Sequence, residues 1–169
     1  MKTMVALCLI LASLGPAHAG TAVGDVPPDS LGRTSGGDEV RVTDQRGKVV
    51  VVTFWASWCG YCRQELPVLA GLQEAAGKQH LTVVAVNYMD DRKVYRALLR
   101  KLKDVQLTMT HDASGAIGKA YEVKGIPRLL MIDRQGKVAY VHVGYGEDST
   151  DRIVDAVNKL LAQPATPGT

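Results

Sequence analysis

Two cysteines separated by two residues, Cys59 and Cys62, stand at the junction of two very different stretches of sequence. Before them, residues 49–54 are β-branched or aromatic at every position, which is typical of a strand buried on both faces of a sheet. After them, apolar residues recur at helical spacing through 64–77, with Pro67 inside the pattern as a kink. A buried strand that leads directly into a helix favours folds in which helices pack against a central sheet.

The same alternation continues towards the C-terminus. Strand-like and helix-like segments take turns as far as residue 121, which favours parallel strands joined by crossover helices. A turn at 133–136 then joins two strand-like runs into an antiparallel hairpin. We expect strands over 39–43, 48–55, 81–86, 106–110, 128–132 and 137–143, and helices over 64–77, from the cap Asp90 through Leu102, over 114–121 and over 149–161. The predicted fold is α/β, with a mixed central sheet flanked by helices on both faces.

The N-terminus has the pattern of a signal peptide. Lys2 is positive, residues 4–14 are apolar, and Ala17-His18-Ala19 has the small-x-small form of a cleavage site. The apolar stretch is short for a membrane span, and an uncleaved anchor is the alternative. The remaining chain is long enough to bury a core without disulfide staples. We expect a signal peptide over 1–19, an extended leader over 20–38, one domain over 39–162 and a flexible tail over 163–169.

Removal of residues 1–19 leaves Cys59 and Cys62 as the cysteines of an exported chain. An oxidising compartment favours their disulfide, but a loop this short constrains the unfolded chain little, so a reactive role is favoured over a structural one. If a helix begins near Cys59, its thiol lies at the positive end of the helix dipole, where a thiolate is stabilised. Cys62, one turn later, can then attack a mixed disulfide on Cys59.

Other kinds of site have less support. Half of a zinc site would need further ligands, but a second cysteine pair is missing and the histidines at 18, 80, 111 and 142 lack ligand spacing, so no metal is expected. The net charge is only +3 and the basic residues are scattered, so no nucleic-acid partner is expected. Trp55 is predicted to pack in the core, whereas Trp58 is expected to form an exposed apolar surface for a polypeptide substrate.

The segment WASWCGYC at 55–62, followed by ELP at 65–67 and GIP at 125–127, resembles the exported thiol-disulfide oxidoreductases of the TlpA/ResA type. The resemblance covers roughly residues 40–161 and implies a thioredoxin-like fold. It also implies a periplasmic location and a redox-active disulfide in place of any bound cofactor.

The resemblance implies a role for each matching residue. Cys59 corresponds to the nucleophile and Cys62 to the resolving cysteine. Ile126-Pro127 corresponds to a cis-proline loop that faces the dithiol and offers backbone pairing to an extended substrate. Trp58, Gly60 and Tyr61 are expected to line the substrate surface beside that loop and to bind the substrate together with it.

Glu65 corresponds to a partly buried acid beneath the active site, which moves protons and raises the thiol pKa. A solvent-exposed helix charge is the alternative reading. Thioredoxin has a buried Asp at the position of Thr53, and because Thr53 cannot accept a proton in the same way, Glu65 is the better candidate for that role. Arg128, where many relatives have Thr, either adds positive charge near the site or points to solvent.

The resulting hypothesis is a periplasmic reductase of disulfides in exported clients, such as apocytochrome c or other envelope proteins. A membrane electron donor of the DsbD/CcdA type would reduce it again, and membrane contact is otherwise limited to the signal segment or anchor. Gly60-Tyr61 also occurs in bacterial disulfide isomerases, which leaves an isomerase or oxidant as an alternative, although residues 20–38 are too short for the dimerisation domain of such enzymes. A copper(I)-handling chaperone, with His111 or His142 as further ligand, is a third possibility.

Overall fold

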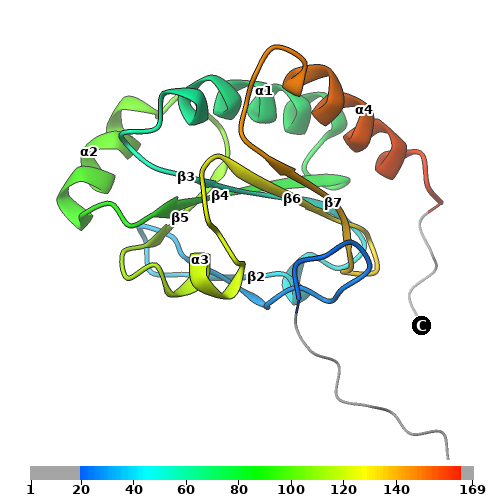
Figure 1. Ribbon diagram of the computed structural model, residues 1–169, viewed down its shortest axis with the longest axis horizontal. Helices are drawn as coiled ribbons and strands as arrows, with labels where there is room; N and C mark the ends of the chain where they lie inside the picture. The colour runs from blue at the N-terminus through cyan, green and yellow to red at the C-terminus, as the bar shows by residue number, and fades with distance from the viewer. Residues whose placement is uncertain (1–19, 165–169) are drawn as a thin grey trace, which may run out of the picture.

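The computed structural model describes residues 20–164, and a seven-stranded sheet crosses its centre (Figure 1). The strand order is β2-β1-β5-β4-β3-β6-β7. The three inner strands β3, β4 and β5 are parallel, and the outer strands pair antiparallel to their neighbours, so the sheet is mixed as predicted. The strands are β1 Ser30–Arg33, β2 Glu39–Arg41, β3 Val49–Trp55, β4 Leu81–Tyr88, β5 Thr108–Asp112, β6 Arg128–Ile132 and β7 Val138–Val143.

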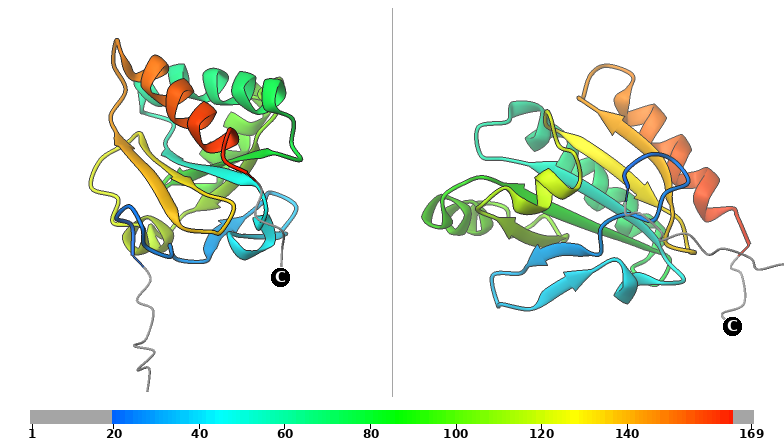
Figure 2. Two further views of the ribbon diagram at one scale, coloured as in Figure 1. Left: turned by 90° about the vertical axis from the view of Figure 1, so that its right-hand side faces the viewer. Right: turned by 60° about the horizontal axis from the view of Figure 1, so that its bottom comes forward.

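Helices cover both faces of this sheet. They are α1 Gly60–Ala76, α2 Arg92–Lys101, α3 Ala116–Ala120 and α4 Ser149–Leu161, and a single 3-10 turn, η1, spans Thr43–Gln45. Figure 2 shows α1 and α4 side by side over one face, with α3 on the other. The fold is thioredoxin-like, and the prediction of an α/β protein with a mixed sheet and helices on both faces is confirmed.

Strand β3 connects the two halves of the core because its side chains alternate between the faces. Val50, Val52 and Phe54 pack on the α3 side, where Tyr121 lies against Phe54 with ring centroids 5.3 Å apart. Val49 and Val51 pack on the side of α1 and α4. Every residue of β3 is buried, which explains why its sequence is a continuous β-branched run. The strand therefore fixes the point at which α1 begins.

Some bounds differ from the sequence-based expectation: β5 lies two residues later than the expected 106–110, and α1 begins four residues before the expected 64–77. Two further differences concern β1 and the start of α2. Strand β1 lies within residues 20–38, where an extended leader was expected, and it pairs with β2 and β5. Its sequence offers one buried apolar side chain, Leu31, so no alternation marks it. Gly32 has a φ of +94° and an added Cβ would lie 3.3 Å from Thr110, so the position favours glycine.

The second difference is a correction at the start of α2. The helix is capped by Asp91, whose carboxylate accepts a hydrogen bond from the Lys93 N–H at 2.7 Å, and the expectation that Asp90 is the cap is wrong. Asp90 is buried and bonded elsewhere.

The expected signal peptide at 1–19 and most of the expected tail, 165–169, lie outside the described residues. Within residues 20–164, none of the helices has the length and apolar character needed to cross a lipid bilayer.

Candidate active site

The cysteine pair lies where β3 passes into α1, and it forms a disulfide with a Cα–Cα distance of 5.3 Å. Cys59 is the N-cap residue of α1, and its sulfur accepts a hydrogen bond from the Cys62 N–H at 3.1 Å. The helix begins four residues before the expected range of 64–77, and so meets the condition that placed the Cys59 thiol at a helix N-terminus. Cys62 is fully buried, while Cys59 retains 6% of its surface. An incoming sulfur can therefore reach Cys59 more readily than Cys62.

Aromatic side chains form an apolar surface around the disulfide. Trp58 is 69% exposed and Tyr61 is 60% exposed, whereas Trp55 is fully buried against the cysteines. Gly60, the first residue of α1, lies between them in the sequence and is also exposed. Large aromatic side chains left in solvent beside a reactive group are typical of a surface that binds another macromolecule.

The loop before β6 closes the other side of the site. The Ile126-Pro127 peptide bond is cis, in agreement with the expectation from the resemblance. Ile126 packs against the apolar cluster that contains both cysteines, so the structure brings the two motifs together from opposite ends of the chain. Arg128 is half-buried and donates a hydrogen bond to the Thr21 hydroxyl at 3.3 Å. Its charge is therefore directed towards the N-terminal segment.

Glu65 lies on the buried face of α1, three residues after Cys62. Its side chain is fully buried, and one carboxyl oxygen accepts a hydrogen bond from the Thr53 hydroxyl at 2.6 Å. The other oxygen has no hydrogen-bond partner among the described residues. Burial raises the pKa of Glu65 to about 7, although the Thr53 bond opposes this shift. The buried face of α1, the helix that carries Cys62, thus holds a carboxyl group that can take or release a proton near neutral pH.

Thr53 is a residue whose role the sequence analysis missed. It was treated as a departure from the pattern, yet its hydroxyl is the hydrogen-bond partner of Glu65. Asp90 and Ser57 were missed too: the Asp90 carboxylate bonds to Ser57, two residues before Cys59. Because β3 and β4 were predicted to be parallel, their carboxyl ends should meet at one edge of the sheet. That rule could have placed Asp90 beside the cysteine loop.

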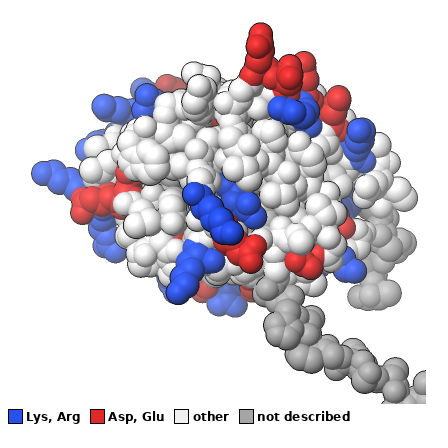
Figure 3. All heavy atoms as spheres, viewed as in Figure 1, with Lys and Arg blue, Asp and Glu red and all other residues white. Residues whose placement is uncertain are grey.

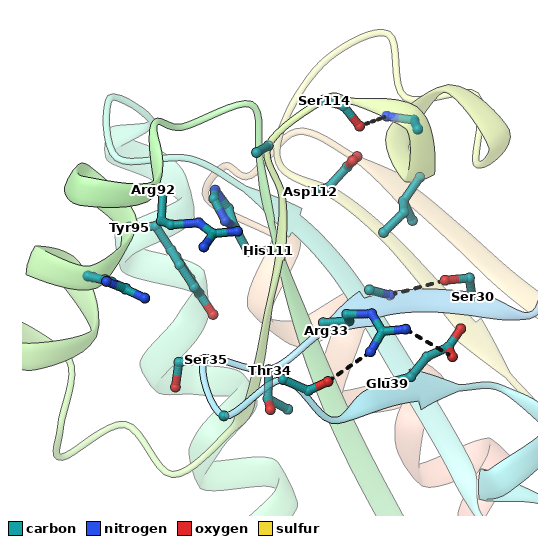
Figure 4. A pocket seen from close by; sticks show the side chains of 17 residues that line it. Ser30, Arg33, Thr34, Ser35, Glu39, Arg92, Tyr95, His111, Asp112 and Ser114 are labelled. Atoms are coloured by element: carbon teal, nitrogen blue, oxygen red, sulfur yellow. Dashed lines mark hydrogen bonds and ion pairs between the residues drawn. The ribbon is translucent and has the colours of Figure 1, made fainter.

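A cavity of about 520 Å³ lies beside this site, between helix α2 and the β1–β2 hairpin (Figure 4). Its lining includes Arg33, Arg92, Tyr95 and His111, but neither cysteine. Tyr95 and His111 stack with ring centroids 4.4 Å apart, and Tyr95 also packs in the cluster that contains the disulfide. Burial raises the pKa of Tyr95 to about 12, so its hydroxyl stays protonated.

The histidines considered as metal ligands have other neighbours. His111 Nε2 lies 2.8 Å from the Asp90 carbonyl oxygen, and His142 Nε2 lies 3.2 Å from the Ser149 hydroxyl. Across residues 20–164, no three His, Cys, Asp or Glu side chains are grouped as metal ligands would be. On the face shown in Figure 3, acidic and basic side chains lie along the edges and also in a small mixed group near the centre, with uncharged surface between them.

Comparison with known proteins agrees with this geometry. A family model described as Redoxin matches residues 22–158. The thioredoxin-like protein YneN of Bacillus subtilis is 32% identical over 129 residues, which are 75% of each chain. The thiol-disulfide oxidoreductase ResA of Geobacillus thermodenitrificans is 30% identical over 152 residues, or 85% of this chain and 86% of the relative. A Chlorobium tepidum structure described as a thiol:disulfide interchange protein DsbE is 35% identical, with a TM-score of 0.74, and covers 85% of this chain and all of the other.

Proposed function

The chain belongs to the redoxin family, with thiol-disulfide oxidoreductases among its relatives, and we propose that it reduces disulfides in exported client proteins. The observation that carries the proposal is the asymmetry of the cysteine pair: Cys59, the N-cap of α1, keeps 6% of its surface exposed, and Cys62 is fully buried one turn below it. The positive end of a helix stabilises the thiolate that must attack. The exposed Trp58 and Tyr61 give a protein client an apolar surface to bind.

The reaction begins from the reduced dithiol. The Cys59 thiolate attacks one sulfur of the client disulfide, forms a mixed disulfide and releases the first client thiolate. Cys62 then loses its proton and attacks the Cys59 sulfur, which releases the second client thiolate. The client gains two electrons, and its two released thiolates can then take up one proton that originates from Cys62 and one from the solvent. The protein is left with the Cys59–Cys62 disulfide seen in the structure. Glu65, with a pKa of about 7, is the group that takes the Cys62 proton.

The oxidised protein must be reduced before another cycle. We place it in the periplasm, which lacks a glutathione buffer, and a membrane electron donor of the DsbD/CcdA type is the proposed source of electrons. The proposed clients are apocytochrome c cysteines, copper-site cysteines and wrongly oxidised envelope proteins. The sequence pattern of residues 1–19 supports this location, which the described residues do not test.

The reduction potential distinguishes a reductase from an oxidant or isomerase. We expect a value nearer to about −270 mV than to about −120 mV, because these are the potentials of a typical reductant and a typical oxidant of this chemistry. The reduction potential is measured by equilibrating the purified protein with mixtures of reduced and oxidised dithiothreitol or glutathione. Alkylation of the free thiols then gives the fraction of protein that is reduced. A strongly oxidising value would overturn the proposal and favour the isomerase or oxidant suggested by Gly60-Tyr61.

Trp58→Ala is expected to weaken reduction of a protein client while sparing a small one. Truncation of an exposed aromatic anchor costs about 2 kcal/mol of binding, so kcat/KM for a disulfide-bonded protein should fall about 30-fold. Glutathione disulfide is too small to need the apolar surface around Trp58. Its kcat/KM should therefore change less than about threefold. Val23→Ala, at a residue 67% exposed in the N-terminal segment, is the control and should leave both rates unchanged. Equal losses with both substrates would contradict a docking role for Trp58.

A further inference from the structure

Ser57 is held by all three of its polar groups, although it lies in a loop. Its backbone N–H donates to Asp90 Oδ2 at 2.7 Å, and its hydroxyl donates to Asp90 Oδ1 at 2.7 Å. Its carbonyl oxygen accepts from the Arg63 guanidinium at 2.8 Å. Ser57 is two residues before Cys59, so the start of the reactive segment is fixed from both sides.

Asp90 is itself fixed by the strands behind it. It is 6% exposed, and its Oδ2 also accepts from the Asn87 side-chain amide at 2.7 Å. Its carbonyl oxygen lies 2.8 Å from His111 Nε2, and the His111 ring stacks on Tyr95 (Figure 4). Asp90 thus joins β4, β5 and α2 to the loop that carries Cys59. The preceding residue, Met89, has a φ of +60°, a conformation that non-glycine residues seldom adopt.

We propose that Asp90 is a positioning residue for thiol exchange, which holds Ser57 with both carboxylate oxygens and so fixes Cys59 at the N-cap of α1. This inference rests on the proposed thiol-disulfide chemistry. The Ser57 N–H and the Asn87 amide donate to one carboxylate oxygen, and the Ser57 hydroxyl donates to the other. An amide could keep these contacts, because the Ser57 hydroxyl can also accept a hydrogen bond, so what distinguishes Asp90 from an Asn is its negative charge.

The same carboxylate places a negative charge beside the reactive loop. Other titratable or charged groups around this region are Arg63 and Glu65 on α1, Tyr95 on α2 and His111 on β5. A negative charge opposes a nearby thiolate, and a firmly held Cys59 keeps its sulfur within reach of Cys62. Both effects favour the disulfide over the reduced protein. Loss of Asp90 should therefore make the disulfide easier to reduce.

The test uses the redox equilibrium with glutathione, in which two glutathione molecules reduce Cys59–Cys62 and leave one glutathione disulfide. Asp90→Asn should shift this equilibrium about tenfold towards the dithiol, or about 30 mV to higher potential. Ser57→Ala keeps the charge and loses one hydrogen bond worth about 1 kcal/mol, so about a fivefold shift in the same direction is expected. The pKa of the reduced Cys59 thiol, from the pH dependence of alkylation, should fall in Asp90→Asn and stay constant in Ser57→Ala.

Asp91→Asn is the matched control. It removes the same charge from the adjacent residue, is exposed, and keeps an acceptor for the Lys93 N–H. It should stay within twofold of the wild type, and an equal shift in the two Asn variants would overturn the inference. If Asp90→Asn does not melt cooperatively, Ser57→Ala becomes the test. A redox equilibrium equal to that of the wild type in Ser57→Ala would then contradict a positioning role for Asp90. A wild type that does not exchange with glutathione at all would instead reject the proposed function.

Discussion

Cys62→Ser is expected to leave the protein joined to its clients by a stable mixed disulfide. Cys59 is accessible and can still attack, but no second sulfur is left to release the client. An adjacent, oriented thiol has an effective concentration of about 10⁵ M in favourable cases, so external thiols at about 10⁻³ M should resolve the adduct up to about 10⁸-fold more slowly. Non-reducing electrophoresis and mass spectrometry of periplasmic extracts would identify the trapped partners.

Cys59→Ser provides the control for this experiment. Its remaining thiol, Cys62, is fully buried and should capture almost nothing. A circular dichroism spectrum like that of Cys62→Ser would show that the two variants share one fold. Adducts that form equally well on both variants would show that the two cysteines do not have separate roles. Absence of any adduct on Cys62→Ser, in the presence of a disulfide-bonded protein added in excess, would contradict nucleophilic attack by Cys59.

Glu65 is expected to make the oxidised protein lose about 3 kcal/mol of unfolding free energy between pH 4.5 and pH 8. The carboxyl group has a pKa of 4.5 when exposed and about 7 when folded, so in this range the folded state binds more protons than the unfolded state. Stability is therefore highest below pH 4.5, falls as pH rises to about 7, and is constant above. Glu65→Gln, which cannot ionise, should lack this decline in urea titrations across the pH range.

The comparison of wild type with Glu65→Gln needs one control variant and one correction for another titrating group. Glu74 lies on the exposed side of the same helix, so Glu74→Gln should follow the wild-type curve. His142, whose pKa is lowered by burial and by Arg152, contributes the opposite slope near its usual titration range, but equally in every variant. The difference between wild type and Glu65→Gln thus isolates the buried carboxyl group. Parallel curves for these two proteins would mean that Glu65 stays ionised and solvated.

Much of the scaffold could be predicted because its signals are local. The β-branched run of β3 and the apolar spacing of α1 each reflect burial of neighbouring residues, and both elements were found near their true bounds. The position of Cys59 at the helix start follows from the same junction. The pairing of Ile126-Pro127 with the cysteines required the family resemblance, since nothing local connects residues so far apart.

The missed contacts depend on how elements pack, which periodicity does not specify. Asp90 and Asp91 are equally good helix caps from sequence, and burial against Ser57 selects Asp91 for the cap. Thr53 meets Glu65 only through the rotation of α1 over β3. Strand β1 has a single buried side chain, Leu31, and is held in the sheet mainly through its backbone. Each of these contacts depends on how distant segments pack together, which cannot be predicted from the sequence of one short segment.

The unequal burial of the two sulfurs also bears on chemical damage. A peroxide that meets the reduced protein reaches Cys59 first, because Cys62 has no exposed surface. The sulfenic acid formed there lies beside a second thiol, which condenses with it to the normal disulfide and expels water. That product re-enters the catalytic cycle, and the irreversible sulfinic and sulfonic acids are avoided. The unequal burial of the two sulfurs therefore protects Cys59 from irreversible oxidation as well as separating the roles of the two cysteines.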